Sequence, residues 1–162
     1  MASFRGWALR VVCVAAGLVL AGAGNAGKTS SGRAEIASFN QKYIDAHLRM
    51  DTPAVLSMWA EDGVSLLPEM APLVGKSAIA KFVEDVVAKM PGYKVTKEEI
   101  DFRDIQVCGD WASEWGLVRQ VVQPPDGKPV IDSHGKILLI LHKDAHGEWK
   151  VQQEMWNSAP KG

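Results

Sequence analysis

The sequence predicts an α+β domain in which three N-terminal helices pack into a strongly curved antiparallel sheet. Up to about residue 90, apolar residues recur at three- and four-residue spacing, which is the period of a helix. From Lys94 onward they alternate, as in strands, and the links between segments are short and rich in turn residues. Short links make neighbouring strands antiparallel. Long strands twist and curl, so we expect the sheet to form a cone with a central pocket.

The three expected helices occupy residues 34–50, 52–60 and 75–90. The first places mainly apolar side chains on one side at helical spacing: Ile36, Phe39, Asn40, Tyr43, Ile44, His47 and Met50. The second begins at Thr52-Pro53, a capping residue followed by proline. The third ends at Pro91-Gly92. Between the second and third helices we expect a small hairpin formed by residues 64–67 and 72–74.

Four long strands are expected at residues 95–108, 111–123, 130–143 and 148–157. In the second of them, Glu114 lies on the opposite face from Trp111, Trp115 and Arg119. Only one of these two sets can face the central pocket, and the alternation does not decide which.

The first 26 residues predict a cleavable secretory signal peptide. Arg5 and Arg10 precede an apolar run from Val11 to Ala23, and small residues follow this run. This run is too short for a membrane span, which needs about 20 apolar residues. Cleavage fits after Ala23 or Ala26, and we prefer Ala26. We therefore expect a secreted or periplasmic protein without membrane attachment, made of a flexible leader at 27–33 and one domain at 34–158.

Composition and residue spacing argue against nucleic acid, a metal ion and a cofactor as partners. The 162 residues carry 18 basic and 19 acidic side chains, so there is no basic excess for binding nucleic acid. Cys108 is the one cysteine left after signal removal, and we expect it to be buried and inert. Asp132 and His134 can share a strand face, but a metal site needs three convergent ligands, so we expect neither a metal nor a cofactor.

Several short motifs accompany this order of elements. They are Tyr43-Ile44-Asp45-Ala46, Met58-Trp59-Ala60-Glu61-Asp62-Gly63-Val64, Gly75-Lys76-Ser77-Ala78-Ile79, Gly109-Asp110-Trp111-Ala112, Gly147-Glu148-Trp149-Lys150 and Met155-Trp156-Asn157-Ser158. In order and spacing the chain resembles the nuclear transport factor 2-like superfamily over residues 34–158. Within it, the chain resembles the SnoaL-like and ketosteroid-isomerase-like branch, and most of all its secreted members of unknown function. This resemblance implies a homodimer formed through the outer face of the sheet.

The resemblance also bears on chemistry. The tyrosine of the steroid isomerases falls on Tyr43, but their catalytic base falls on Leu67, just before Pro68, and their second acid near Leu141. Leucine has no titratable atom, so we expect no steroid isomerisation unless Glu69 serves as the base.

Tyr43 and His47 are the candidate catalytic residues, because one helical turn separates them and their side chains share a face. The alternative is that both are core residues whose polar atoms are satisfied internally. We expect the pocket to be lined further by Trp59, Leu67, Glu69, Trp115 and Trp156.

These observations favour a pocket that binds a small, largely apolar organic molecule. The domain is then either a cofactor-free acid/base catalyst, such as an isomerase or cyclase, or a non-catalytic binding module. A dimerisation module that works through its outer sheet face is the third alternative. The sequence does not decide whether the protein is an enzyme.

Overall fold

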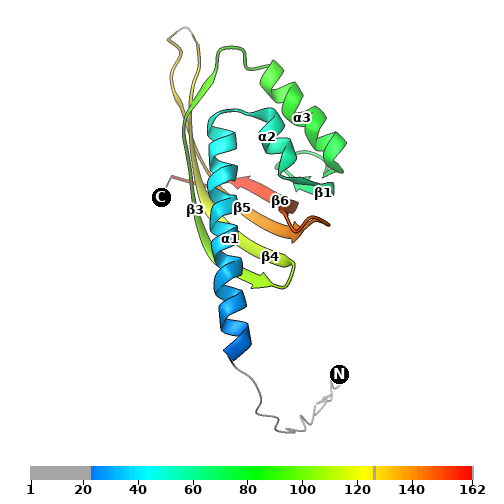
Figure 1. Cartoon of the computed structure of the whole chain (residues 1–162). Coiled ribbons are helices and arrows are strands. Elements are labelled where there is room, and N and C mark those ends of the chain that lie inside the picture. The colour runs from blue at the N-terminus through cyan, green and yellow to red at the C-terminus, as the bar shows by residue number, and fades with distance from the viewer. Residues whose placement is uncertain (1–22, 126, 162) are drawn as a thin grey trace, which may run out of the picture.

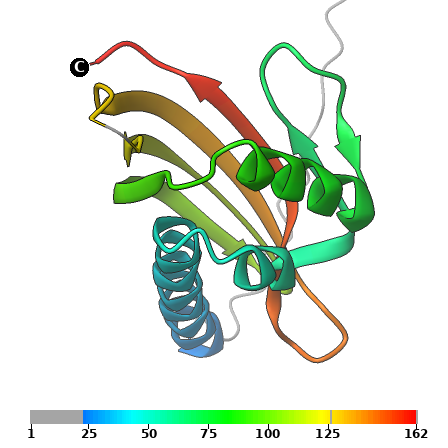
Figure 2. The ribbon, with the colours of Figure 1, turned by 90° about the horizontal axis from the view of Figure 1, so that it is seen from above.

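A curved, unclosed sheet of six strands carries three helices on one side (Figures 1 and 2). The computed structural model describes residues 23–125 and 127–161. Its elements, in chain order, are α1 (Ala23–Leu48), α2 (Thr52–Ser57), β1 (Trp59–Leu66), β2 (Leu73–Val74), α3 (Lys76–Ala88), β3 (Lys94–Cys108), β4 (Trp111–Gln123), β5 (Ile131–Lys143) and β6 (Trp149–Ser158). The strand order is β2-β1-β6-β5-β4-β3, with β1 parallel to β6 and the other pairs antiparallel. The α+β class predicted from the sequence is confirmed.

The first helix begins earlier than predicted. Residues 27–33, expected to be a flexible leader, are helical and belong to α1. Their polar composition suggested flexibility, but the segment contains no proline, and Gly32 packs closely against Val107 of β3. Residues 1–22, which hold most of the expected signal peptide, lie outside the described residues. No helix in the described part of the chain is long and apolar enough to cross a membrane.

The second helix is shorter than predicted, because Trp59 begins β1 instead of lying on a helix that continues to residue 60. The backbone N–H of Val151 donates to the carbonyl of Met58 at 2.7 Å, and Trp59 then pairs with Val151 of the parallel strand β6. The pairing of β1 with β6 therefore overrides the local helical pattern.

The core lies between α1 and the inner face of the sheet. Ile36, Phe39 and Ala46 of α1 pack against the central strands, where Leu139, Leu141 and Val151 are fully buried. This packing fixes the long axis of α1 across the sheet (Figure 1). The C-terminal half of the helix is thereby held above β3–β6.

Two β-bulges decide which side chains of β3 and β6 face the helices. In the pairing of β3 with β4, Val95 lies opposite Val122 and Lys97 opposite Val121, so Thr96 is an extra residue. In the pairing of β6 with β5, Gln153 lies opposite Ile140 and Val151 opposite Leu141, so Gln152 is an extra residue. Each bulge inverts the alternation that follows it.

A third irregularity in β3, between Arg103 and Gln106, keeps Val107 packed on the core side. Cys108 is then exposed at the end of the strand. The expectation that this thiol is buried was wrong, because the alternation that buries Val107 turns the next residue outward.

Candidate functional site

A cavity of about 150 Å³ lies between the C-terminal half of α1 and the inner face of the sheet. Its polar lining comes from α1 and four strands and consists of Tyr43, His47, Glu98, Gln120, Ser133 and Glu154. Its apolar lining consists of Leu67, Ile100, Val118, Gly135, Ile137 and Trp156. We call it the acidic cavity, because it contains two carboxyl groups and, among its described lining residues, no lysine or arginine.

Glu154 is held in place by two hydroxyl groups. The Tyr43 hydroxyl donates to Glu154 Oε2 at 2.6 Å, and Ser65 Oγ donates to Oε1 at 3.5 Å. Burial raises the pKa of Glu154, and the hydrogen bond from Tyr43 acts in the opposite direction. Burial, followed by the charge of Glu154, also raises the pKa of Tyr43 well above its usual value. Tyr43 is therefore a protonated donor that positions the carboxyl group.

His47 has one ring nitrogen committed to the helix. Its Nδ1 lies 2.8 Å from the backbone carbonyl of Tyr43, and a carbonyl only accepts, so Nδ1 carries the proton. In the neutral ring Nε2 is then an unprotonated acceptor. The His47 ring also packs on the Tyr43 ring, with 4.1 Å between their centroids. This contact and the hydrogen bond fix the orientation of the imidazole.

Glu98 is the second carboxyl group of the cavity. It lies opposite Gln120 in the sheet and accepts a 2.8 Å hydrogen bond from the Gln120 side-chain amide. Burial raises the pKa of Glu98, while this hydrogen bond and the charge of His47 lower it. His47 acts in the same lowering direction on the pKa of Glu154. The imidazole therefore interacts electrostatically with both carboxyl groups.

A third buried carboxyl group, Glu114, lies in the core outside the lining of the acidic cavity. It is 2% exposed and accepts a 2.8 Å hydrogen bond from Asn40 Nδ2. Burial raises its pKa from the usual 4.5 to about 7. Its second oxygen, Oε1, has no hydrogen-bond partner among the described residues.

The structure brings together some of the site residues expected from the sequence and separates others. Tyr43, His47, Leu67 and Trp156 all line the acidic cavity. Leu141, near which the resemblance places the second acid of the steroid isomerases, is fully buried in the core.

Trp59, Glu69 and Trp115 do not line this cavity, so these three expectations were wrong. Trp59 is 4% exposed and packs in the core, because it belongs to β1. Glu69 is exposed in the turn after β1, at a backbone φ of +61°. Trp115 lies on the outer face of β4 and is 39% exposed, because its neighbour Glu114 takes the inner face.

Sequence reasoning missed Glu98 and did not select Glu154. Alternation from Val95 would place Glu98 outside, and alternation from Trp149 and Val151 would do the same for Glu154. The bulges at Thr96 and Gln152 reverse both facings. A bulge of this kind leaves no clear trace in a single sequence, and Glu154 had only its strand position to indicate it.

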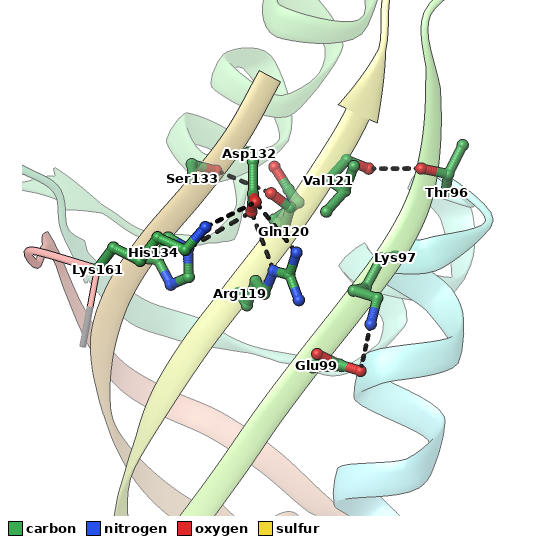
Figure 3. A network of polar contacts seen from close by, with 10 residues as sticks. All are labelled: Thr96, Lys97, Glu99, Arg119, Gln120, Val121, Asp132, Ser133, His134 and Lys161. Carbon is green, nitrogen blue, oxygen red and sulfur yellow. Dashed lines mark hydrogen bonds and ion pairs between the residues drawn. The ribbon is translucent and has the colours of Figure 1, made fainter. Parts of the chain in front are cut away.

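Asp132, the acidic residue considered for metal binding, forms an ion pair with Arg119 on the outer face of the sheet. Asp132 accepts two hydrogen bonds from Arg119, each 3.0 Å long, and lies 3.5 Å from His134 (Figure 3). The hydrogen bonds and the charge of Arg119, followed by the charges of His134 and Lys161, lower the pKa of Asp132. Within residues 23–125 and 127–161, no three His, Cys, Asp or Glu side chains are placed to hold a metal ion.

A known protein family and several solved structures share this fold. A family model described as a SnoaL-like domain matches residues 40–131. A ketosteroid isomerase-like protein from Erwinia carotovora atroseptica has a similar structure, with a TM-score of 0.67 and 22% identity, over 79% of this chain and 96% of that one. ActVI-ORFA from Streptomyces coelicolor gives a TM-score of 0.67 at 15% identity, over 79% and 97% of the two chains.

A third similar structure, from Catenulispora acidiphila, was solved in complex with S-DNPA. It gives a TM-score of 0.64 at 14% identity, over 80% of this chain and 94% of that one. No curated protein sequence matches the chain. At these identities the similar structures establish the fold alone.

Proposed function

The chain belongs to the SnoaL-like domain family, and from this premise we propose that it binds a small, largely apolar organic molecule in the acidic cavity. The cavity supports this proposal through its composition. Ile100, Val118 and Ile137 supply apolar walls, while a few polar groups converge from α1 and the sheet. This combination is typical of small-molecule sites. A structure of the same fold was solved in complex with the compound S-DNPA, which also supports it.

We propose further that the bound molecule undergoes cofactor-free acid/base chemistry of the isomerase or cyclase type. One observation carries this proposal: a histidine whose Nδ1 is committed to the Tyr43 carbonyl, and whose Nε2 donates to none of the described residues, shares the cavity with two carboxyl groups of raised pKa. Neutral His47 then serves as the general base, and Glu98 or Glu154, whose pKa values burial raises, as the general acid. Tyr43 acts as a positioning residue, because its hydroxyl is committed to Glu154.

A thermal-shift screen of small neutral organic molecules tests binding. We expect some of them to raise the melting temperature of the wild-type chain, because a ligand that binds only the native state stabilises it. Leu67→Trp places a larger side chain in the cavity and should abolish the shift. Leu117→Trp makes the same change on the exposed outer face and should preserve it. Equal shifts in the two variants would contradict binding in the acidic cavity.

Turnover of a ligand found in this way tests the catalytic proposal. We expect His47→Gln to lower kcat by about 100-fold or more, the usual contribution of a general base, while the affinity changes little. If the ligand is turned over equally fast by wild type and His47→Gln, His47 is not the base. If wild type binds the ligand without converting it, the domain is a binding module.

The outer face of the sheet supports a second proposal, that two copies of the chain form a homodimer through it. Trp115, Leu138 and Met155 lie side by side on three adjacent strands, opposite one another in the register. They are 39%, 41% and 42% exposed. A contiguous apolar row of this kind on a sheet face is typical of a protein–protein interface.

We also propose export to the periplasm or the cell exterior, on the sequence of residues 1–26 alone. Mass spectrometry of the exported protein should find an N-terminus at Gly24 or Gly27. An exported chain that retains Met1 would contradict this proposal.

A further inference from the structure

We infer that the ligand of the acidic cavity carries a protonated amine at one end and an apolar body at the other. The inference rests on the proposed ligand binding and specifies the chemical class of the ligand. Two independent observations carry it. One is the hydrogen-bonding character of the acidic cavity, and the other is an apolar cleft that adjoins this cavity.

Most hydrogen-bond donors of the acidic cavity are already used by the protein. The Tyr43 hydroxyl donates to Glu154, and the Gln120 side-chain amide donates to Glu98. The Ser133 hydroxyl donates to the backbone carbonyl of Gln120 at 3.2 Å. His47 Nδ1 donates to the carbonyl of Tyr43. The indole N–H of Trp156, which lies against Gly135, donates to none of the described residues and stays open to a ligand.

The groups left for a ligand are therefore mainly acceptors. They are the carboxyl oxygens of Glu98 and Glu154 and, in the neutral ring, Nε2 of His47. An ammonium group has three N–H donors and no acceptor, so it complements this set. A carboxylate ligand would bring its negative charge against the carboxyl oxygens of Glu98 and Glu154, with no lysine or arginine among the described lining residues to balance it.

The proton balance of binding is simple. An alkylamine, like a lysine side chain, is already an ammonium ion at pH 7.5, so it brings its proton into the cavity. Where the carboxyl group that it meets is protonated, that O–H bond breaks and the proton leaves to solvent, so that an ammonium and a carboxylate are in contact in the complex. The pair is stabilised because a charge-assisted hydrogen bond replaces a neutral one.

An apolar cleft of about 180 Å³ provides room for the rest of the ligand. It is lined mainly by apolar residues of α2, α3 and β4 and of the turns that follow α1 and α3: Met50, Val55, Val83, Val87, Met90 and Val122. His47 and Gln120 line both this cleft and the acidic cavity, so the two spaces adjoin at these side chains. A molecule with its amine at Glu98 and Glu154 can therefore extend its hydrocarbon part past His47 into the cleft.

Calorimetric titration with three probes of equal chain length tests the inference: octylamine, octan-1-ol and octanoate at pH 7.5. We expect octylamine to bind the full chain at least tenfold more tightly than octan-1-ol, and octanoate to show no measurable binding. The double variant Glu98→Gln, Glu154→Gln should lose the preference for the amine and keep its affinity for the alcohol. Glu99→Gln is the matched control, because Glu99 is exposed on the opposite face of β3.

The outcomes separate this inference from the proposed function. Suppose that the wild-type chain binds the amine and the alcohol equally tightly, and that Leu67→Trp binds neither. This result would overturn the amine inference and leave the ligand-binding proposal intact. Preferential binding of octanoate would overturn the inference as well. Failure of all three probes to bind would also overturn it, and the library screen would then decide the proposed function independently. Val87→Lys, which places a charge in the cleft, should weaken octylamine binding more than binding of the short amine propylamine.

Discussion

At the scale of single residues, Glu114 makes the stability of this domain depend on pH. Its carboxyl group is buried beside Asn40, and its pKa is raised from 4.5 to about 7. Below pH 4.5 the group is protonated in both the folded and the unfolded chain. Between pH 4.5 and about 7 the unfolded chain releases this proton more readily than the folded chain. The free energy of unfolding therefore falls across this window and loses about 3 kcal/mol.

Replacing Glu114 with glutamine removes this loss. We predict that Glu114→Gln unfolds at higher denaturant concentration than wild type at pH 8, with a gain of about 2–3 kcal/mol, and about as easily at pH 4. Chemical denaturation at both pH values measures the difference. Glu84→Gln, a change at an exposed carboxyl group of α3, is the control and should leave the profile unchanged. A wild-type profile that is flat between pH 4.5 and 7 would contradict the buried carboxyl account.

At the scale of secondary-structure elements, the two bulges connect the fold to the site. Glu98 and Glu154 reach the cavity only because Thr96 and Gln152 are extra residues in their strands. Bulges are common near functional sites because they redirect a side chain without changing the rest of the sheet.

Deleting Gln152 tests this role. Without the extra residue, Glu154 and Trp156 turn to the outer face, and Gln153 and Met155 turn inward. We predict that the deletion lowers the melting temperature strongly and removes ligand binding. Gln152→Ala keeps the bulge and loses only the hydrogen bond to Asp62, so it should cost about 1 kcal/mol or less. A deletion variant as stable and as active in binding as Gln152→Ala would contradict the assignment.

The same elements show how far the sequence alone can predict the site. Strand and helix periods place Tyr43 and His47 on the inner face of α1, because helical spacing is regular. Alternation alone could not place Trp115 or Glu114 on a face, since both facings agree with an alternating pattern. It also failed for Glu98, because pairing between strands creates the bulge that redirects it. The α+β class was predictable, whereas the acidic character of the cavity required the strand register.

At the scale of the whole molecule, the sheet presents two different faces. The inner face packs on the helices and contains the acidic cavity. The outer face carries an apolar row at its centre, formed by Trp115, Leu138 and Met155, together with the ionic network around Asp132 (Figure 3). We propose that one sheet binds a ligand on one side and a second copy of the chain on the other.

We predict that Leu138→Asp converts a dimer into a monomer, because a carboxylate at the centre of the apolar row would be desolvated in the interface. Sedimentation velocity at several protein concentrations measures the change. Val86→Asp, at an exposed apolar residue of α3, is the control and should stay dimeric. A wild-type chain that sediments as a monomer at all concentrations would rule out the homodimer.

The central claim is that a small organic molecule binds on the inner side of the sheet, and indole N–H resonances test it most directly. Trp156 lines the acidic cavity and Trp115 lies on the outer face, so one two-dimensional ¹H–¹⁵N NMR spectrum reports on both sides of the sheet. Trp156→Phe and Trp115→Phe assign the two signals. We predict that molecules which stabilise the protein shift the Trp156 signal and leave that of Trp115 in place. A shift of Trp115 alone, or an unchanged Trp156 signal with every stabilising molecule, would contradict the claim.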